Sequence, residues 1–285
     1  MKRIYKLLSS VIALALLIGG YFFLREPETV DPSGSFSIHF MDVGQADAAL
    51  VQCEGHYMLI DGGNKGDSDL VYTVLKNANV PKLDIIVATH AHEDHIGGLP
   101  GALNYTTADL TLCPVTEYES KVFEDFAKYA KQNGGGITVP QVGDTYSLGS
   151  ATVTILAVNT FEDPNGSSIV LRIDYGETSF LFMGDADQAV EKQLVERQAD
   201  LYCNVLKVGH HGSESSTGGE LMFYARPQYA VISVGEDNSY GHPHDAIFPL
   251  MERYDVNVYR TDKNGDVYCT SDGKSVTFSS DRLYG

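Results

Sequence analysis

Ligand-type side chains follow directly behind a short apolar run, and this arrangement constrains the fold more than any other feature of the sequence. The run Asp84–Ala88 has the β-branched composition of a buried strand. Four potential ligands then follow within six positions: His90, His92, Asp94 and His95. Histidines crowded in this way repel one another when protonated unless an anion or a metal ion organises them. Because zinc, manganese and iron prefer imidazole and carboxylate ligands, the pattern predicts a metal site at the end of a strand.

The spacing of these four ligands predicts two metal ions. In an extended stretch the H-x-H spacing turns His90 and His92 the same way, whereas Asp94 and His95 lie further along and reach a neighbouring ion. A helical zincin motif is excluded in its usual form, because the histidines of His92–His95 are three residues apart and H-E-x-x-H requires four.

Short β-rich runs alternate with amphipathic helices from residue 36 onward, which predicts an α+β domain of packed sheets covered by helices. The predicted strands are Phe36–Met41, Ala48–Cys53, Tyr57–Ile60, Ile85–Ala88, Ala151–Ala157, Ile169–Ile173, Ser179–Met183, Val205–Val208 and Tyr229–Val234. The predicted helices are Asp69–Ala78, Ser120–Gln132, Gln188–Gln198, Gly219–Arg226 and Asp245–Tyr254. The stretch Val256–Phe278, with turns at Lys263–Gly265 and Asp272–Gly273, predicts strands and hairpins that complete a sheet. Since no second linker or repeat interrupts residues 36–285, we expect one domain there.

The stretch Thr89–Gly98 reads T-H-x-H-x-D-H-x-G-G and resembles the signature of the metallo-β-lactamase superfamily. This resemblance implies an αβ/βα sandwich of two mixed β-sheets flanked by helices. Phe182–Asp185 resembles the Gly-Asp of the family, whose carboxylate bridges both ions; Asp187 suits the cap of the following helix better. The run Val205–Ser213 supplies the late histidine of the second ion. Because adjacent side chains point apart, we expect His210 to bind the ion and His211 to contact substrate.

Longer motifs resemble one branch of this superfamily, the hydrolase domain of the ComEC/Rec2 competence proteins and its free-standing relatives. His39–Asp47 is similar to their opening H-F-x-D-V-G-Q-G-D, with Ala46 in place of the glycine. The segments Leu59–Gly63, His210–Ser213 and Ser233–His244 also match, so the resemblance spans residues 36–273. No competence-type bundle of membrane helices accompanies the domain, which leaves a role in DNA uptake open.

The resemblance implies two divalent metal ions, zinc or else manganese. The first would be held by His90, His92 and Asp185 with an open position, because Glu162–Ile169 lacks the histidine that many members place there. The second would be held by Asp94, His95, Asp185 and His210. We expect Asp94, His211 and His242 to be catalytic, Asn165, Ser168, His211 and His242 to contact substrate, and Asp42 and Asp61 to orient the ligands or their loop.

The implied activity is hydrolysis by a hydroxide held between the two ions, most suited to a phosphodiester. A β-lactamase or lactonase acting on carboxylic substrates is the second hypothesis, which the missing histidine disfavours. A non-catalytic metal-binding or scaffold domain is the third. The formal net charge is −18, and it is −22 without the four N-terminal cations. Such an acidic body repels nucleic acid, so a small phosphodiester is as plausible a substrate as DNA. The sequence indicates no protein partner.

The N-terminus predicts a membrane anchor over residues 1–24. Lys2, Arg3 and Lys6 precede Leu7–Leu24, which has no charged side chain and would rise roughly 27 Å as a helix. The cations favour a cytoplasmic N-terminus with the domain outside, joined by a linker over residues 25–35. A cleaved signal peptide, which would make the protein secreted, is the alternative; its only small-residue motif, Ala13–Ala15, lies inside the apolar run.

Four cysteines are spread singly along the chain: Cys53, Cys113, Cys203 and Cys269. None lies at metal-binding spacing, so we do not expect them to be ligands. The sequence leaves disulfide bridges and buried thiols equally open.

Overall fold

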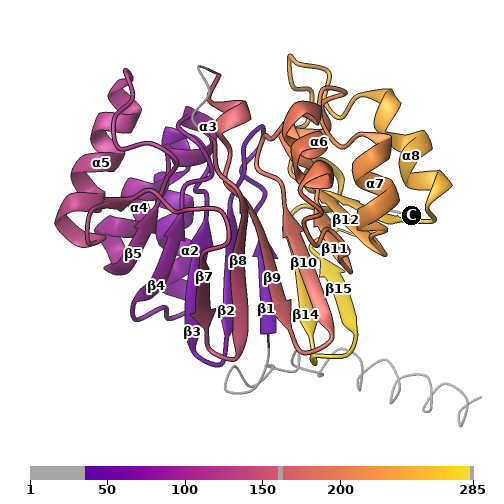
Figure 1. Cartoon of the computed structure of the whole chain (residues 1–285). Coiled ribbons are helices and arrows are strands. Elements are labelled where there is room, and N and C mark those ends of the chain that lie inside the picture. Colours follow the sequence, from indigo (N-terminus) through magenta and orange to yellow (C-terminus); the bar gives the residue numbers. More distant parts are fainter. Residues whose placement is uncertain (1–35, 160–162, 283–285) are drawn as a thin grey trace, which may run out of the picture. The chain divides into compact units, whose positions relative to one another are not determined.

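The computed structural model describes residues 36–159 and 163–282, and these residues form four layers. Two β-sheets pack face to face, and helices cover the outer face of each sheet (Figure 1). This is the αβ/βα arrangement that the sequence predicts. The predicted anchor and linker, residues 1–35, lie outside the described residues. No helix within the described part of the chain combines the length and the apolar character that crossing a membrane requires.

The first sheet has eight strands in the order β15-β14-β1-β2-β3-β4-β5-β6. Strands β15 to β3 pair antiparallel, and β3 to β6 pair parallel. Their bounds are β1 Phe36–Phe40, β2 Ala49–Cys53, β3 His56–Ile60, β4 Leu83–Val87, β5 Ala108–Leu112, β6 Ile137–Thr138, β14 Val267–Ser271 and β15 Val276–Ser280. The parallel half therefore brings the carboxyl ends of β3 and β4 to one edge.

The second sheet has seven strands in the order β13-β12-β11-β10-β9-β8-β7. Here β7 to β10 pair antiparallel and β10 to β13 pair parallel. Their bounds are β7 Thr145–Leu148, β8 Ala151–Ala157, β9 Val170–Tyr175, β10 Thr178–Phe182, β11 Val205–Lys207, β12 Tyr229–Ile232 and β13 Asn257–Arg260.

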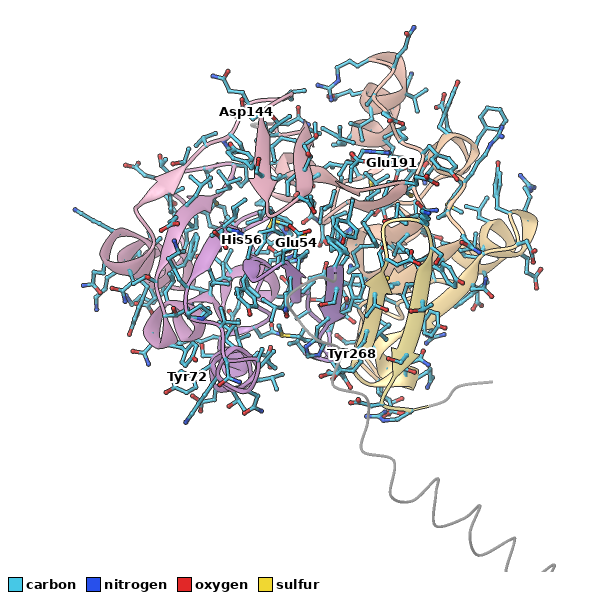
Figure 2. The ribbon with its side chains drawn as sticks, turned by 90° about the horizontal axis from the view of Figure 1, so that it is seen from below. Glu54, His56, Tyr72, Asp144, Glu191 and Tyr268 are labelled. Carbon is cyan, nitrogen blue, oxygen red and sulfur yellow. The ribbon has the colours of Figure 1, made fainter. Side chains whose placement is uncertain are left out.

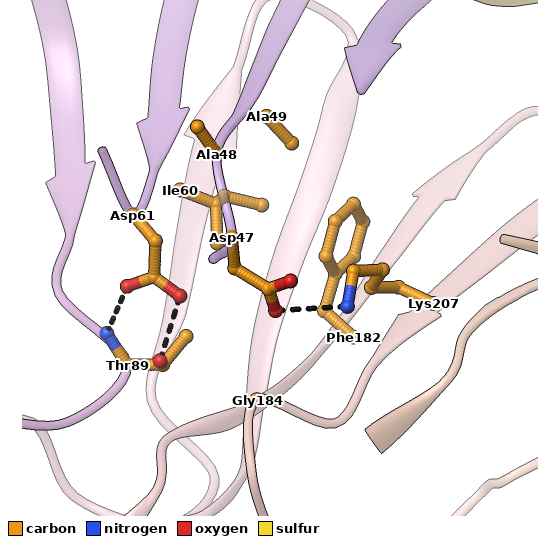
Figure 3. A pocket seen from close by; sticks show the side chains of 9 residues that line it. All are labelled: Asp47, Ala48, Ala49, Ile60, Asp61, Thr89, Phe182, Gly184 and Lys207. Atoms are coloured by element: carbon orange, nitrogen blue, oxygen red, sulfur yellow. Dashed lines mark hydrogen bonds and ion pairs between the residues drawn. The ribbon is translucent and has the colours of Figure 1, made fainter. Parts of the chain in front are cut away.

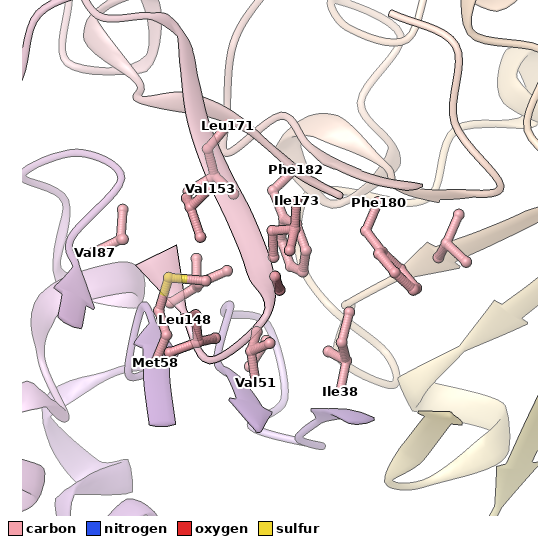
Figure 4. Close-up of a cluster of buried hydrophobic side chains, with 14 of the residues drawn as sticks. Ile38, Val51, Met58, Val87, Leu148, Val153, Leu171, Ile173, Phe180 and Phe182 are labelled. Atoms are coloured by element: carbon pink, nitrogen blue, oxygen red, sulfur yellow. The ribbon is translucent and has the colours of Figure 1, made fainter. Parts of the chain in front are cut away.

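Three apolar clusters hold the layers together. Alternate residues of β1 (Phe36, Ile38 and Phe40) point between the sheets, where they meet side chains of β9 and β10 such as Phe180 and Phe182 (Figure 4). Every residue of β10 is buried, as expected for a strand covered on both faces.

Helices and short 3-10 turns cover the outer faces and the site edge. The first sheet is covered by α2 Ser68–Asn77, α4 Leu99–Tyr105 and α5 Lys121–Asn133, and the second by α6 Gln188–Glu196, α7 Gly219–Ala225 and α8 Phe248–Arg253. The shorter pieces are α3 Glu93–Ile96, α9 Thr261–Asn264, η1 Lys65–Asp67, η2 Asn165–Ser167, η3 Gly209–Gly212 and η4 Asp245–Ile247. Asp187 caps α6 by accepting from the backbone of Ala189 and Val190, as predicted.

One predicted turn is wrong. Lys263–Gly265 does not close a hairpin, because β13 pairs with β12 in the second sheet while β14 pairs with β1 in the first. The connecting residues form α9 and cross between the sheets. The turn at Asp272–Gly273 does join the antiparallel strands β14 and β15, as predicted. All four cysteines are buried free thiols, which answers the question of bridges.

Candidate metal centre

The predicted ligands meet at one edge of the sandwich because the strands that precede them run parallel. His90 follows β4, Asp185 follows β10, and the His210–His211 pair follows β11. Asp61 follows β3, next to β4. The carboxyl ends of parallel strands are where open α/β sheets usually bind ligands, and here two sheets contribute to one site.

The H-x-H-x-D-H stretch bends at residues 90–92 and then enters α3, with an extended backbone at His92 itself. His90 Nε2 lies 3.0 Å from His92 Nδ1, so the two rings face each other as the spacing predicts. Asp94 and His95 occupy the single turn of α3. His90 and His95 are fully buried, with ring centroids 4.0 Å apart.

Two turns pack so closely beside this loop that only glycine fits. The amide of Gly62 donates to the carbonyl of His95 at 2.7 Å, and that of Gly98 donates to Gly63 at 3.2 Å. A Cβ on Gly98 would overlap the carbonyl oxygen of Gly62. The Gly-Gly of the signature therefore lets the turn that bears Asp61 approach the ligand loop.

Asp61 holds His95 in place, as expected of an orienting carboxylate (Figure 3 shows its bonds to Thr89). The amide and the hydroxyl of Thr89 both donate to Asp61 at 2.7 Å, and His95 Nδ1 lies 2.8 Å from Asp61 Oδ2. With Nδ1 engaged, His95 Nε2 points into the cluster, 3.4 Å from Asp185 Oδ1. Asp42 has no such role in the described structure: its carboxylate faces the amide of Gly44 and the guanidinium of Arg282.

Asp185 stands on a left-handed glycine, Gly184, with a φ of +54°. Its amide donates to Ser168 Oγ at 3.0 Å, and that hydroxyl lies 3.5 Å from His90 Nδ1. Ser168 is fully buried beneath these two groups. The structure thus places it under the ligands, and it does not line the substrate cavity as the sequence suggested.

The tandem histidines both lie in the left-handed region, with φ values of 49° for His210 and 53° for His211. Non-glycine residues rarely adopt this conformation, and consecutive ones concentrate strain at a functional site. His211 is 2% exposed; its Nδ1 lies 3.0 Å from the carbonyl of Ser233, and its Nε2 lies 3.3 Å from Asp94 Oδ2. His210 is one-quarter exposed, with Nε2 3.7 Å from Asp185 Oδ2. Both rings therefore face the cluster, and His211 lies deeper in it.

The donor set fits metal ions. Ligand-type atoms of His90, His95 and Asp185 lie within 4.8 Å of one another, and so do those of Asp94, His95 and His211. Six buried side-chain atoms of the described residues have no hydrogen-bond partner, and three of them belong to this donor set: His95 Nε2, Asp185 Oδ1 and His211 Nε2. Buried polar atoms are rarely left unpaired, and these three converge.

Protons compensate for the charges when no cation is bound. Burial opposes ionisation of Asp185, but His95 and His211 hold its pKa well below the usual range. In turn, and against the effect of burial, Asp185 and its neighbouring carboxylates raise the pKa of His95 well above normal and that of His211 to about 10. A cation among the same atoms would displace such protons.

A cavity of about 370 Å³ opens above the cluster. Its lining residues are Gln45, His92, Glu93, Asp94, Asn165, Asp185, His210, His211, Tyr240 and His242. Neither lysine nor arginine is among them. Asn165 Oδ1 is buried without a partner in the described structure, and the ring of Tyr240, 68% exposed, stacks on His242 with centroids 5.6 Å apart.

Gln45 fixes His242 at the cavity wall. The amide of Gly235 donates to Gln45 Oε1 at 3.1 Å, which directs Gln45 Nε2 to His242 Nδ1 at 3.4 Å. Since that amide nitrogen donates, Nδ1 accepts and Nε2 carries the proton. Burial and neighbouring His244 lower the pKa of His242 to about 4, so its ring is neutral near pH 7.

Sequence patterns missed two charged residues beneath the cluster, Asp47 and Lys207. The sequence did contain a signal for both residues. Lys207 is the one charged residue of the otherwise apolar run Val205–Val208, and Asp47 is the last residue of the His39–Asp47 motif.

Known proteins agree with this architecture. The crystal structure of the metallo-beta-lactamase fold protein YhfI from Bacillus subtilis superposes with a TM-score of 0.54 at 14% identity, covering 86% of this chain and 100% of that one. The diiron β-hydroxylase CmlA from Streptomyces venezuelae superposes with a TM-score of 0.52 at 14% identity, covering 83% of this chain and 54% of that one. These identities support the fold alone.

Two relatives are more similar to this chain in sequence. ComE operon protein 3 of Bacillus subtilis is 28% identical over 87% of this chain and 34% of its own length, and competence protein ComA of Neisseria gonorrhoeae is 30% identical over 88% and 34%. The chain thus spans about a third of each. Residues 41–236 match the family described as the metallo-beta-lactamase superfamily. With the fold, the ligand loop and this match in agreement, the chain belongs to the metallo-beta-lactamase superfamily.

Proposed function

We propose that the protein is a metal-dependent phosphodiesterase. The observation that carries the proposal is the convergence of three buried ligand-type atoms without a hydrogen-bond partner, on His95, Asp185 and His211, beside an open cavity. Bound there, two divalent cations, zinc or manganese, would neutralise phosphoryl charge and activate a water molecule. Two other residues that line the cavity, Asn165 and His242, could then contact the substrate.

We assign the ligands as follows. His90, His92 and Asp185 would hold one cation, and Asp94, His95, Asp185 and His211 the other. His211 replaces His210 in this assignment because its Nε2 is buried beside Asp94, whereas His210 is partly exposed in the cavity. His210 becomes the substrate contact.

The residues around the cations position the diester. His242 Nε2–H donates to a phosphoryl oxygen, since its Nδ1 is engaged by Gln45. Its neutral ring favours this hydrogen bond over donation of a whole proton. Asn165 offers an amide to the same cavity.

The substrate we propose is a small phosphodiester. Among the residues that the structure describes, neither lysine nor arginine lines the cavity, so the bound cations would compensate most of the charge of the substrate. A diester carries one negative charge per phosphate, whereas long polyanions would meet the acidic body. Nucleic acid is the second candidate substrate, because the chain resembles the hydrolase domain of competence proteins.

Paired assays test the proposal on the purified full chain. With zinc or manganese added, we expect hydrolysis of bis-p-nitrophenyl phosphate and little of the β-lactam nitrocefin. Asp185→Ala should abolish hydrolysis and bound metal while the protein stays folded. Preferential hydrolysis of nitrocefin would favour the lactamase hypothesis, and metal binding without turnover of any ester would favour a scaffold.

We also propose that residues 1–24 anchor the chain and leave the catalytic body outside the cytoplasm, on the strength of the cations before an uncharged run of 18 residues. An alkaline phosphatase fused after residue 285 should be active in cells. An inactive fusion that is nevertheless expressed would contradict this orientation.

A further inference from the structure

A lysine and an aspartate form a buried ion pair directly beneath the histidine cluster. Lys207 Nζ lies 2.8 Å from Asp47 Oδ2, and the two side chains are 4% and 7% exposed. Lys207 Nζ also donates to the carbonyl of Val208 at 3.1 Å. The pair joins β11 of the second sheet to the β1–β2 connection of the first (Figure 3). Buried ion pairs contribute little net stability, so this one invites another explanation.

Asp47 connects three segments of the site. Its amide donates to the carbonyl of Asp94 at 3.0 Å, and its own carbonyl accepts from Gly63 at 2.8 Å. Its side chain reaches Lys207, three residues before the tandem histidines. One residue thus contacts the ligand loop, the turn after Asp61 and the strand that leads to His211.

The second oxygen of Asp47 faces His211. Asp47 Oδ1 lies 3.5 Å from His211 Nδ1 and is buried without a hydrogen-bond partner in the part of the chain that the structure describes. His211 Nδ1 also lies 3.0 Å from the carbonyl of Ser233, which can only accept. Two acceptors on one side of the ring make Nδ1 the donor and turn Nε2 toward Asp94 and Asp185.

The same ion pair also engages one member of a third group of possible metal ligands. Atoms of Asp47, Asp61 and His95 lie within 4.8 Å of one another and could attract a cation. However, Lys207 occupies Asp47 Oδ2, and His95 Nδ1 and Thr89 occupy Asp61 Oδ2. Asp47 Oδ2 and Asp61 Oδ2 are therefore less available to a cation than the atoms of His95, Asp185 and His211 that lack a hydrogen-bond partner.

We propose that Asp47 and Lys207 are positioning residues for the metal ligand His211: the ammonium of Lys207 fixes the carboxylate of Asp47, whose free oxygen keeps His211 Nδ1 as a donor and Nε2 directed at the cation. This inference rests on the proposed metal site. The pair would have two effects: each charge balances the other in the interior, and Asp47 orients the ligand His211. Mutations can distinguish these two effects.

Three variants of the full chain test the proposal: Asp47→Asn, Lys207→Met, and both together. Each single variant leaves one buried group without its partner, so the Tm of the metal-free protein should fall. The double variant removes both charges and should recover most of that Tm. Its zinc affinity, measured by competition with a chromophoric chelator, should nevertheless remain about 10- to 100-fold weaker for one of two equivalents.

The control is Arg172→Met, which breaks the ion pair of Arg172 with Asp174 on β9. It should leave the affinity for both zinc equivalents unchanged. Normal affinity in the double variant would overturn the positioning role, because the pair would then serve stability alone. A wild-type chain that binds no zinc would instead overturn the proposed function, and this inference with it.

Discussion

The bond between Asp61 and His95 allows a sharp test of ligand orientation. In Asp61→Asn the side chain keeps its shape, but one carboxylate oxygen becomes an amide group. The remaining oxygen can still accept a hydrogen bond from the amide of Thr89, which lies 2.7 Å from Asp61 Oδ1 in the wild type. The amide group then faces His95 Nδ1, 2.8 Å away in the wild type, so two donors would meet.

His95 can avoid that conflict by losing the proton on Nδ1 and keeping the one on Nε2. This proton would point at Asp185 Oδ1, 3.4 Å away, and would occupy the position of the cation. The free energy of unfolding of the metal-free protein should therefore fall by less than one charge-assisted hydrogen bond contributes, which is about 1.5 to 3 kcal/mol. The new contact between His95 and Asp185 offsets part of that loss. The affinity for one cation should fall about 10- to 100-fold, or about 1.4 to 2.8 kcal/mol.

Zinc titration against a chromophoric chelator measures the affinity, and chemical denaturation of the metal-free protein measures the stability. Asp84→Asn is the matched control, because Asp84 accepts from His56 Nδ1 at 2.9 Å and from the amide of Tyr57 at 2.8 Å. His56, labelled in Figure 2, begins β3, whereas the proposed ligands follow the carboxyl ends of β4, β10 and β11. Equal zinc affinity in Asp61→Asn and Asp84→Asn would refute the tautomer argument.

Three further outcomes are expected. His211→Ala should lose about one equivalent of zinc by elemental analysis, whereas His210→Ala should keep both and raise KM; the reverse result would restore His210 as the ligand. Burial raises the pKa of Glu191 from 4.5 to about 7, so its contribution to stability is present below pH 4.5 and is lost as pH rises through about 7. In Glu191→Gln the unfolding free energy should therefore fall less steeply between about pH 5 and 8, and an unchanged slope would count against this. Gly98→Ala should cost about 3 kcal/mol on denaturation because a Cβ would overlap a carbonyl, while Gly66→Ala, with open space around it, should be nearly neutral.

Local patterns in the sequence determined the strands that precede the site and the ligands of the loop. Short, mainly apolar runs followed by a histidine or an aspartate predicted β4, β10 and β11, because a strand buried on both faces needs a mainly apolar sequence. The strands β5, β6 and β7 were missed, since they are short or polar and pair through the sheet instead of through their own pattern.

Only the tertiary structure decided which groups face the proposed metal site. The sequence favoured His210 over His211 as the ligand, whereas the structure buries His211 deeper in the cluster, because the left-handed backbone of both residues and the carbonyl of Ser233 orient the rings. It could not find the pair of Asp47 and Lys207, 160 positions apart, because a contact between two sheets leaves no periodic trace. The sequence by itself therefore determined which ligands the chain carries and which strands deliver them. Their orientation was settled by packing, because it depends on hydrogen bonds between segments distant in the chain.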